Sequence, residues 1–275
     1  MDAGQTAGRR PVGPAVLLCL VGLAAHAQVA ANRTTLYLHP TDVTDARALW
    51  VNPAGLARFD EASLHTDVTV GDPGAAGRLR QLTVGFVSRG FSFGYQRDIF
   101  AAGARGHTYR LGLATAHARL AAGVALALYR GGTSATGWDL GALYAAAPGL
   151  TFGAVIEHLG QPTVRDSTLP VTYVPGATVR LGGTGAALSA HGRLTSHGVT
   201  SYALGLRVGF REATALPIHG LARVDTDRAL TRTGFAFGIS LGGQDVAGAV
   251  ATTPGDASRV DALSLYGVST RRPGR

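Results

Sequence analysis

The chain has 275 residues, of which 39 are glycine, 46% are apolar and only 15% are charged, with a formal net charge of +8. This composition excludes a disordered chain, which would be rich in charge, and collagen, which needs glycine at every third position, and it disfavours a helical protein, because interior glycine costs a helix about 1 kcal/mol. All 25 basic residues are arginine and are spread along the whole length, so we expect no nucleic-acid partner.

The first 27 residues have the pattern of a cleaved Sec-type signal peptide. Arg9 and Arg10 precede an apolar run over residues 15–25 that is too short to span a membrane. Ala25 and Ala27 then supply the small side chains that a signal peptidase recognises. Cys19 is the only cysteine and lies in this segment, so we expect a mature chain without disulfides or thiols.

Residues 28–60 show no alternation of apolar and polar positions. Asp42 or Thr44 is a candidate N-cap for a short helix over residues 45–51, and Pro53 with Gly55 is expected to end it. This element is too short to fold alone. It can fill the interior of the domain that follows as a plug, or lie outside that domain as an arm.

Residues 61–270 repeat one pattern, in which large apolar residues alternate with small or polar ones over eight to eleven positions before a break containing Gly, Pro, Asp or Ser. A clear example is Phe235, Phe237, Ile239 and Leu241, alternating with Gly234, Ala236, Gly238 and Ser240. We count about fourteen candidate strands (12 to 14) at about 15 residues each, enough for a tilted strand that crosses a bilayer and a short turn.

The two faces of these strands distinguish a membrane barrel from a soluble β-sandwich. A sandwich needs bulky side chains on its inner face, whereas here the face opposite the large apolar residues is small or carries arginine. The sequence therefore predicts an all-β protein, a transmembrane antiparallel β-barrel over residues 61–270, followed by a basic tail at 271–275. Eight glycines on the inner face would leave room for a plug or a solute: Gly85, Gly94, Gly112, Gly123, Gly141, Gly153, Gly205 and Gly238.

Residues 45–57 resemble a known segment. Their central Asn52-Pro53-Ala54-Gly55 is similar to the N-terminal NPAGLA hatch of the FadL-type outer-membrane proteins, the long-chain fatty acid transporter superfamily, and of the related PorV-like barrels. The resemblance implies a hatch inside a fourteen-stranded barrel in the bacterial outer membrane. The same four residues are also compatible with a simple helix stop.

The resemblance implies two alternative functions. In FadL-type transporters, small hydrophobic or amphipathic molecules such as fatty acids enter from outside and leave sideways through a gap in the wall. PorV-like barrels instead anchor or assist a partner protein in secretion or assembly. One departure weakens the first: only residues 98–106 and 160–169 look long enough to be more than turns, whereas FadL-type transporters usually have larger extracellular loops.

The alternation also places charges inside the predicted barrel. They are Arg110, Arg180, Arg193, Arg207 and Arg223, with Asp67, Asp139 and Glu157. These residues can attract an anionic solute, since arginine holds a carboxylate through two parallel hydrogen bonds, or they can form an internal lattice of salt bridges. The expected partners are thus membrane lipid, a hydrophobic or anionic small molecule, and a partner protein.

We find no motif for catalysis or for a cofactor. The sequence lacks a G-x-S-x-G elbow, an H-E-x-x-H pair and a P-loop. Of nine scattered histidines, His65 and His191 are expected to point inward and His158 to lie on the apolar phase, and none pairs with another at the sequence spacing of metal ligands. We therefore expect neither an enzyme nor a metal site.

Overall fold

The computed structural model describes residues 35, 37–58, 62–74, 77–100, 105–131, 134–164, 167–182, 185–210 and 216–271. The predicted signal peptide and the tail beyond Arg271 lie outside these residues. Within them, no helix is long and apolar enough to cross a membrane.

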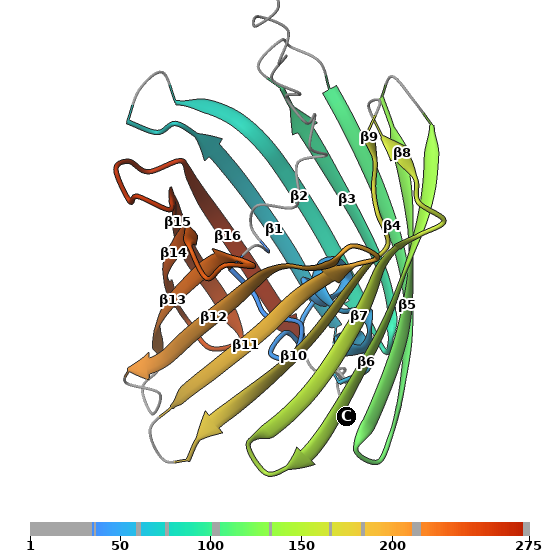
Figure 1. The fold of residues 1–275 in the computed structure, drawn as a ribbon. Coiled ribbons are helices and arrows are strands. Elements are labelled where there is room, and N and C mark those ends of the chain that lie inside the picture. Colours follow the sequence, from blue (N-terminus) through green and yellow to red (C-terminus); the bar gives the residue numbers. More distant parts are fainter. Residues whose placement is uncertain are drawn as a thin grey trace, which may run out of the picture.

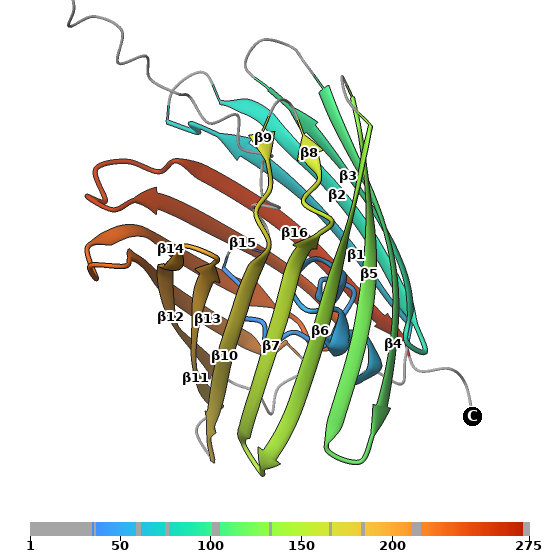
Figure 2. The same ribbon diagram turned by 45° about the vertical axis from the view of Figure 1, so that its right-hand side comes forward.

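Fourteen antiparallel strands form a closed barrel, which confirms the predicted fold class and strand number (Figures 1 and 2). The strands are β1 (Ala62–Gly71), β2 (Arg78–Ser88), β3 (Phe91–Ile99), β4 (Arg105–His117), β5 (Leu120–Arg130), β6 (Ala135–Ala147), β7 (Leu150–Leu159), β10 (Thr172–Leu181), β11 (Ala186–Thr195), β12 (Gly198–Phe210), β13 (Ile218–Asp227), β14 (Arg232–Leu241), β15 (Asp245–Pro254) and β16 (Ala262–Arg271). Each strand pairs with its neighbour in sequence order, and β16 pairs with β1, so no strand edge is left open.

The pleat separates the two faces of the wall as the alternation predicts. In β1, Leu64 is 46% exposed while the next residue, His65, is fully buried. In β14, Phe237 is 52% exposed while Ala236 is 3% exposed. Large apolar side chains therefore face outward, as lipid contact requires, and small or polar ones face the interior.

The two edges of the barrel differ. We call the edge where β1 begins and β16 ends the lower edge, because the C-terminus leaves there in Figure 1, and the opposite one the upper edge. A small hairpin of β8 (Thr163–Val164) and β9 (Ser167–Thr168) stands at the upper edge between β7 and β10. Exposed aromatic residues lie toward both edges, in two belts typical of membrane interfaces: Tyr109, Trp138, Tyr173 and Tyr202 above, and Phe91, Tyr144, Phe152 and Phe210 below.

One expected loop is strand at both of its ends. β3 continues to Ile99 and β4 begins at Arg105, so the segment 98–106 is shorter as a connection than predicted. Asp98 keeps the strand phase because its inward carboxylate accepts hydrogen bonds from Gln81 (2.8 Å) and Gln96 (3.0 Å).

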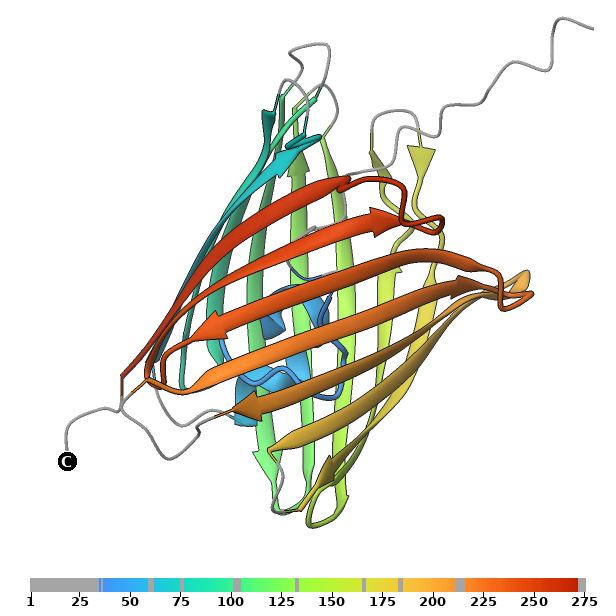
Figure 3. The same ribbon diagram turned by 90° about the vertical axis from the view of Figure 1, so that its left-hand side faces the viewer.

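Residues 37–58, which we call the inner segment, lie inside the barrel (Figure 3). They contain the helix α1 (Ala48–Val51) and the 3-10 helix η1 (Pro53–Arg58), and η1 packs against β4, β5 and β6. The segment brings a small apolar core into the lumen, formed by Val43, Ala46, Ala48, Leu49 and Leu56 with Val87 and Ala125 of the wall.

The predicted helix and its caps are wrong in detail. α1 has only four residues, its N-cap is Arg47, and no side chain caps it. Asp42 instead pairs with wall arginines, and Asp45 accepts a hydrogen bond from the Arg47 backbone at 2.8 Å. α1 does end at Val51, before Pro53 as predicted, but Pro53 then starts η1, because its fixed φ suits a first helical turn.

Candidate functional site

Asn52 ties the Asn52-Pro53-Ala54-Gly55 run to the barrel wall. Its Nδ2 donates to the carbonyls of Pro40 (2.8 Å) and Ala142 of β6 (3.3 Å), and its Oδ1 accepts from the Ala54 backbone N–H (3.1 Å). The side chain is fully buried, so these bonds satisfy polar groups that water cannot reach. The motif is thus a fixed contact between the inner segment and β6.

Glycines on the wall let the inner segment approach this closely. Seven of the eight inward glycines face it, so that a Cβ added at any of them would lie within 4 Å of its atoms: Gly85, Gly94, Gly112, Gly123, Gly141, Gly153 and Gly205. At Gly112 the added carbon would lie 2.6 Å from Leu49 and 2.8 Å from Leu56. Gly238 is the exception, since its Cβ would meet Val250 of the neighbouring strand.

A second anchor joins the start of the inner segment to β16. Tyr37 stacks on Tyr266 with ring centroids 5.7 Å apart, and the Arg47 guanidinium lies over the Tyr266 ring and donates to the Tyr37 hydroxyl at 3.0 Å. Asp45 completes the cluster through its ion pair with Arg47 at 2.6 Å. Burial alone would raise the pKa of Asp45, but the adjacent Arg47 holds it below its usual value. The cluster therefore stays charged and paired.

Three of the five predicted interior arginines pair one to one with carboxylates. Arg110 contacts Asp139 at 2.6 Å, Arg193 pairs with Glu157, and Arg223 contacts Asp225 at 2.6 Å. Arg110 and Arg223 also donate to backbone carbonyls of the inner segment, those of Leu49 (3.1 Å) and Leu38 (2.9 Å). These three pairs form the salt-bridge lattice that was one of the two expected roles.

The other two arginines share one carboxylate. Arg180 and Arg207 approach the same oxygen of Asp42, at 3.3 Å and 3.2 Å. The local excess of positive charge therefore lies below the inner segment, and the arginine side chains there are 52% and 39% exposed. The remaining predicted residue, Asp67, lies with His65 at 3.3 Å, both buried.

Sequence reasoning missed two carboxylates of this lattice. Asp225 lies two residues from Arg223 on the same strand face, so the alternation alone was enough to find it. Asp42 had no such signal, because its position depends on how the inner segment folds against distant strands.

Sequence reasoning also missed a pair of histidines. The Nδ1 atoms of His39 in the inner segment and His191 in β11 lie 3.0 Å apart, a contact that the spacing of the histidines in the sequence does not indicate. Burial, and then the nearby Arg223, lower the pKa of His39 to about 3, which keeps its imidazole neutral. One ring then donates and the other accepts.

His158 also departs from its predicted place. It has a φ of +60°, and the β6–β7 register shifts between Trp138 and Leu140, so its side chain turns inward although the phase predicted the apolar face. Its backbone N–H donates to Asp139 at 2.9 Å.

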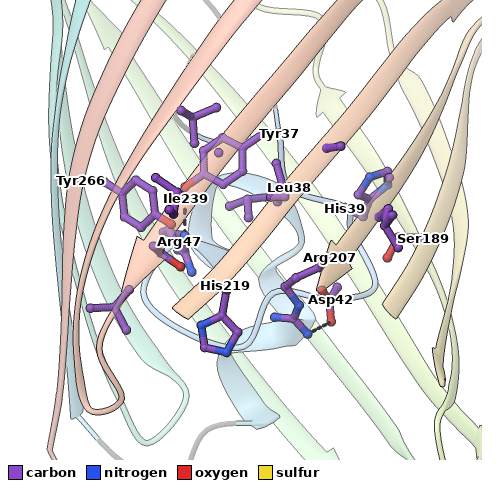
Figure 4. A pocket seen from close by; sticks show the side chains of 18 residues that line it. Tyr37, Leu38, His39, Asp42, Arg47, Ser189, Arg207, His219, Ile239 and Tyr266 are labelled. Carbon is purple, nitrogen blue, oxygen red and sulfur yellow. Dashed lines mark hydrogen bonds and ion pairs between the residues drawn. The ribbon is translucent and has the colours of Figure 1, made fainter. Parts of the chain in front are cut away.

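Two cavities flank the inner segment. The upper cavity, about 180 Å³, lies toward the upper edge and has a mixed lining, in which Arg110, Tyr129, Glu157, His158 and Arg193 stand beside Leu38, Trp50, Val51, Leu169 and Val174. The lower cavity, about 170 Å³, lies between the inner segment and strands β11 to β16 (Figure 4). Its lining combines apolar groups with charged and titratable ones: Leu38, Leu221, Val246, Val250 and Tyr266, with Asp42, Arg207 and His219.

Within the part of the chain that the structure describes, no group of three or more His, Cys, Asp or Glu residues could hold a metal ion.

The fold is shared with solved outer-membrane barrels, whereas no family model and no curated protein matches the sequence. The structure entitled CymD monoaromatic hydrocarbon channel aligns with a TM-score of 0.58 and 10% identity over 86% of this chain and 96% of its own. The Ralstonia pickettii toluene transporter TbuX aligns with a TM-score of 0.52 and 13% identity, over 83% of this chain and 94% of its own. A bacterial polysaccharide outer membrane secretin aligns with a TM-score of 0.52 and 11% identity, over 78% of this chain and 99% of its own. The FadL-type resemblance is thus confirmed for the fold, which several functions share.

Proposed function

We propose that this chain is an outer-membrane channel of the FadL type that passes small amphipathic molecules. The observation that carries the proposal is the pair of cavities inside a closed barrel, one on each side of an inner segment that is anchored to the wall. A barrel that only filled its lumen would need no such spaces. The fold shared with the hydrocarbon channel and the toluene transporter supports the same function.

The size of the cavities favours a single-ring solute. Each is close to the ~150 Å³ of an apolar cavity that binds benzene. A long-chain fatty acid would extend well beyond either of them. The mixed lining of the lower cavity, with Arg207 and His219 beside leucine and valine side chains, matches a ring that carries one polar or anionic group.

Uptake into proteoliposomes tests this function. Vesicles that contain the refolded protein should accumulate benzoate faster than empty vesicles, while an extended solute such as dodecanoate should gain little. Organic extraction of the purified protein followed by mass spectrometry should recover small amphipathic molecules. Equal benzoate uptake in both kinds of vesicle, together with an empty extract, would refute the channel.

The competing proposal is a PorV-like barrel that assists a partner protein. A closed wall is also what such a barrel would have. Chemical crosslinking in intact cells separates the two, because a partner-assisting barrel should give one stoichiometric crosslinked protein and no benzoate uptake.

A further inference from the structure

The two cavities meet at one layer of side chains. Leu38 lines both cavities, His39 lines the lower one, and His191 lines the upper one. Arg223, which lines the upper cavity, donates to the Leu38 carbonyl at 2.9 Å, and the two imidazoles touch at 3.0 Å. We call Leu38, His39, His191 and Arg223 the partition.

On the opposite side the inner segment is packed onto the wall without space. Leu49 and Leu56 are fully buried against Gly112 of β4, and Pro53 lies on the backbone at Gly123 of β5. Asn52 bonds β6 directly. A solute could pass there only if backbone atoms moved, so the face toward β3 to β6 is sealed.

Most seams of the wall are paired among the described strands. Beside the upper cavity, however, the β10–β11 ladder skips Val174 and Pro175 of β10 and Gly192 and Arg193 of β11, between the formed pairs Tyr173–Leu194 and Gly176–His191. Opening a paired seam toward lipid would leave backbone groups without partners where no water can replace them, at several kcal/mol for each group. Sideways release, which the family resemblance implies, is therefore disfavoured along the paired seams, and the break in the β10–β11 ladder is the competing exit that the blocking experiment below distinguishes from the axial route.

We propose that solutes cross this barrel along its axis, from one cavity to the other through the partition, and that Leu38 sets the width of this passage. The inference rests on the proposed channel function. Leu38 is half-buried and its side chain can swing without breaking an ion pair, unlike the anchors at Asn52 and Arg47.

The polar groups of the partition also select the solute. A molecule that displaces the His39–His191 contact must offer hydrogen bonds in exchange, because an unpartnered buried donor costs about 1–3 kcal/mol. A carboxylate or phenol can accept from Arg223 or an imidazole, whereas a hydrocarbon cannot. The passage should therefore favour single-ring solutes with a hydrogen-bonding group over hydrocarbons of the same size.

A blocking experiment tests the route. Leu38→Cys is made in a chain with Cys19→Ser, is reconstituted, and is treated with a bulky methanethiosulfonate reagent. Leu230→Cys, at an exposed leucine in the β13–β14 turn that the reagent can reach, is the control. We expect modification of Leu38→Cys to abolish most benzoate uptake and a reducing agent to restore it, while the control variant keeps its uptake. Leu38→Ala should speed uptake several-fold and Leu56→Ala should not.

The outcomes separate the route from the function. If the protein takes up benzoate but modified Leu38→Cys, verified by mass, still transports, the axial route is wrong. Equal loss of uptake after modification of Leu38→Cys and of Leu230→Cys also overturns it. If the unmodified protein takes up no benzoate, the channel function fails and the route with it. Phenol should slow benzoate uptake and benzene should not, and equal competition would overturn the selectivity.

Discussion

At the scale of single residues, glycine has a defined task in this barrel. The excess of glycine first argues only against helices, yet its inward positions face an inner segment that could not otherwise lie so close to the wall. At Gly123 an added Cβ would lie 2.7 Å from the Ala54 nitrogen, and backbone atoms cannot rotate away as a side chain can. The small size of the residue is required there, more than its conformational freedom.

We expect Gly123→Ala to destabilise the protein by about 1–3 kcal/mol, the usual effect of overpacking. Gly267→Ala is the control, because its nearest neighbour, Thr66 Oγ1, would lie 3.5 Å away. That change should be neutral or stabilising by up to about 1 kcal/mol. Urea unfolding in lipid vesicles measures both, and equal effects would show that the inner segment does not press on Gly123.

His39 makes the inner segment sensitive to acid. In the unfolded chain its pKa is near 6.5, and in the folded protein it is about 3. Between these values the unfolded state binds more protons, so the free energy of unfolding falls with falling pH, by up to about 1.4 kcal/mol per pH unit from this group. His39→Asn should flatten the pH dependence of the unfolding midpoint between about pH 6.5 and 3. Parallel curves for the two proteins would contradict the burial of a neutral His39.

At the scale of elements, the sequence of each strand indicates by itself which of its two faces meets lipid. The period of two fixes the faces within about ten residues of sequence, and the closed ladder only confirms them. The inner segment behaves differently, since α1 has four residues and no capping side chain. Such a helix is stable only through the wall that surrounds it.

Phe237→Arg at the middle of β14 should cost about 2–4 kcal/mol, because it places a charge in the hydrocarbon layer. Gly238→Ser on the inner face should cost much less, since the contact it makes is with a movable Val250 methyl group at 2.9 Å. Comparison of the two unfolding free energies in bilayers checks the phase of the strand. A larger loss for Gly238→Ser would mean that the faces are reversed.

At the scale of the whole molecule, closure of the barrel supplies the stability that its small interior side chains cannot give as a bulky core. Every strand of the barrel has two paired neighbours, so the backbone is satisfied without a bulky core. Two aromatic belts and an apolar outer face then match a bilayer. The charged side chains inside the lumen are mostly paired, with two arginines sharing the carboxylate of Asp42.

This architecture predicts how the protein behaves in the cell and on a gel. It should fractionate with outer membranes, and its apparent mass on a gel should change on boiling, because a closed barrel resists detergent until it is heated. A version without residues 1–27 should remain in the cytoplasm as unfolded protein. Recovery of the full chain from the soluble periplasm would contradict the membrane barrel.

The amino-acid sequence determined the barrel, its approximate number of strands and the direction of most side chains in the wall, because alternation is a local property that every strand carries by itself. It also indicated which glycines and arginines face inward. Only the tertiary structure decided what they meet there: Asp42 between Arg180 and Arg207, His39 against His191, and His158 turned inward by a register shift. These contacts join residues up to 165 positions apart. They depend on how the barrel closes around the inner segment, which no local pattern records.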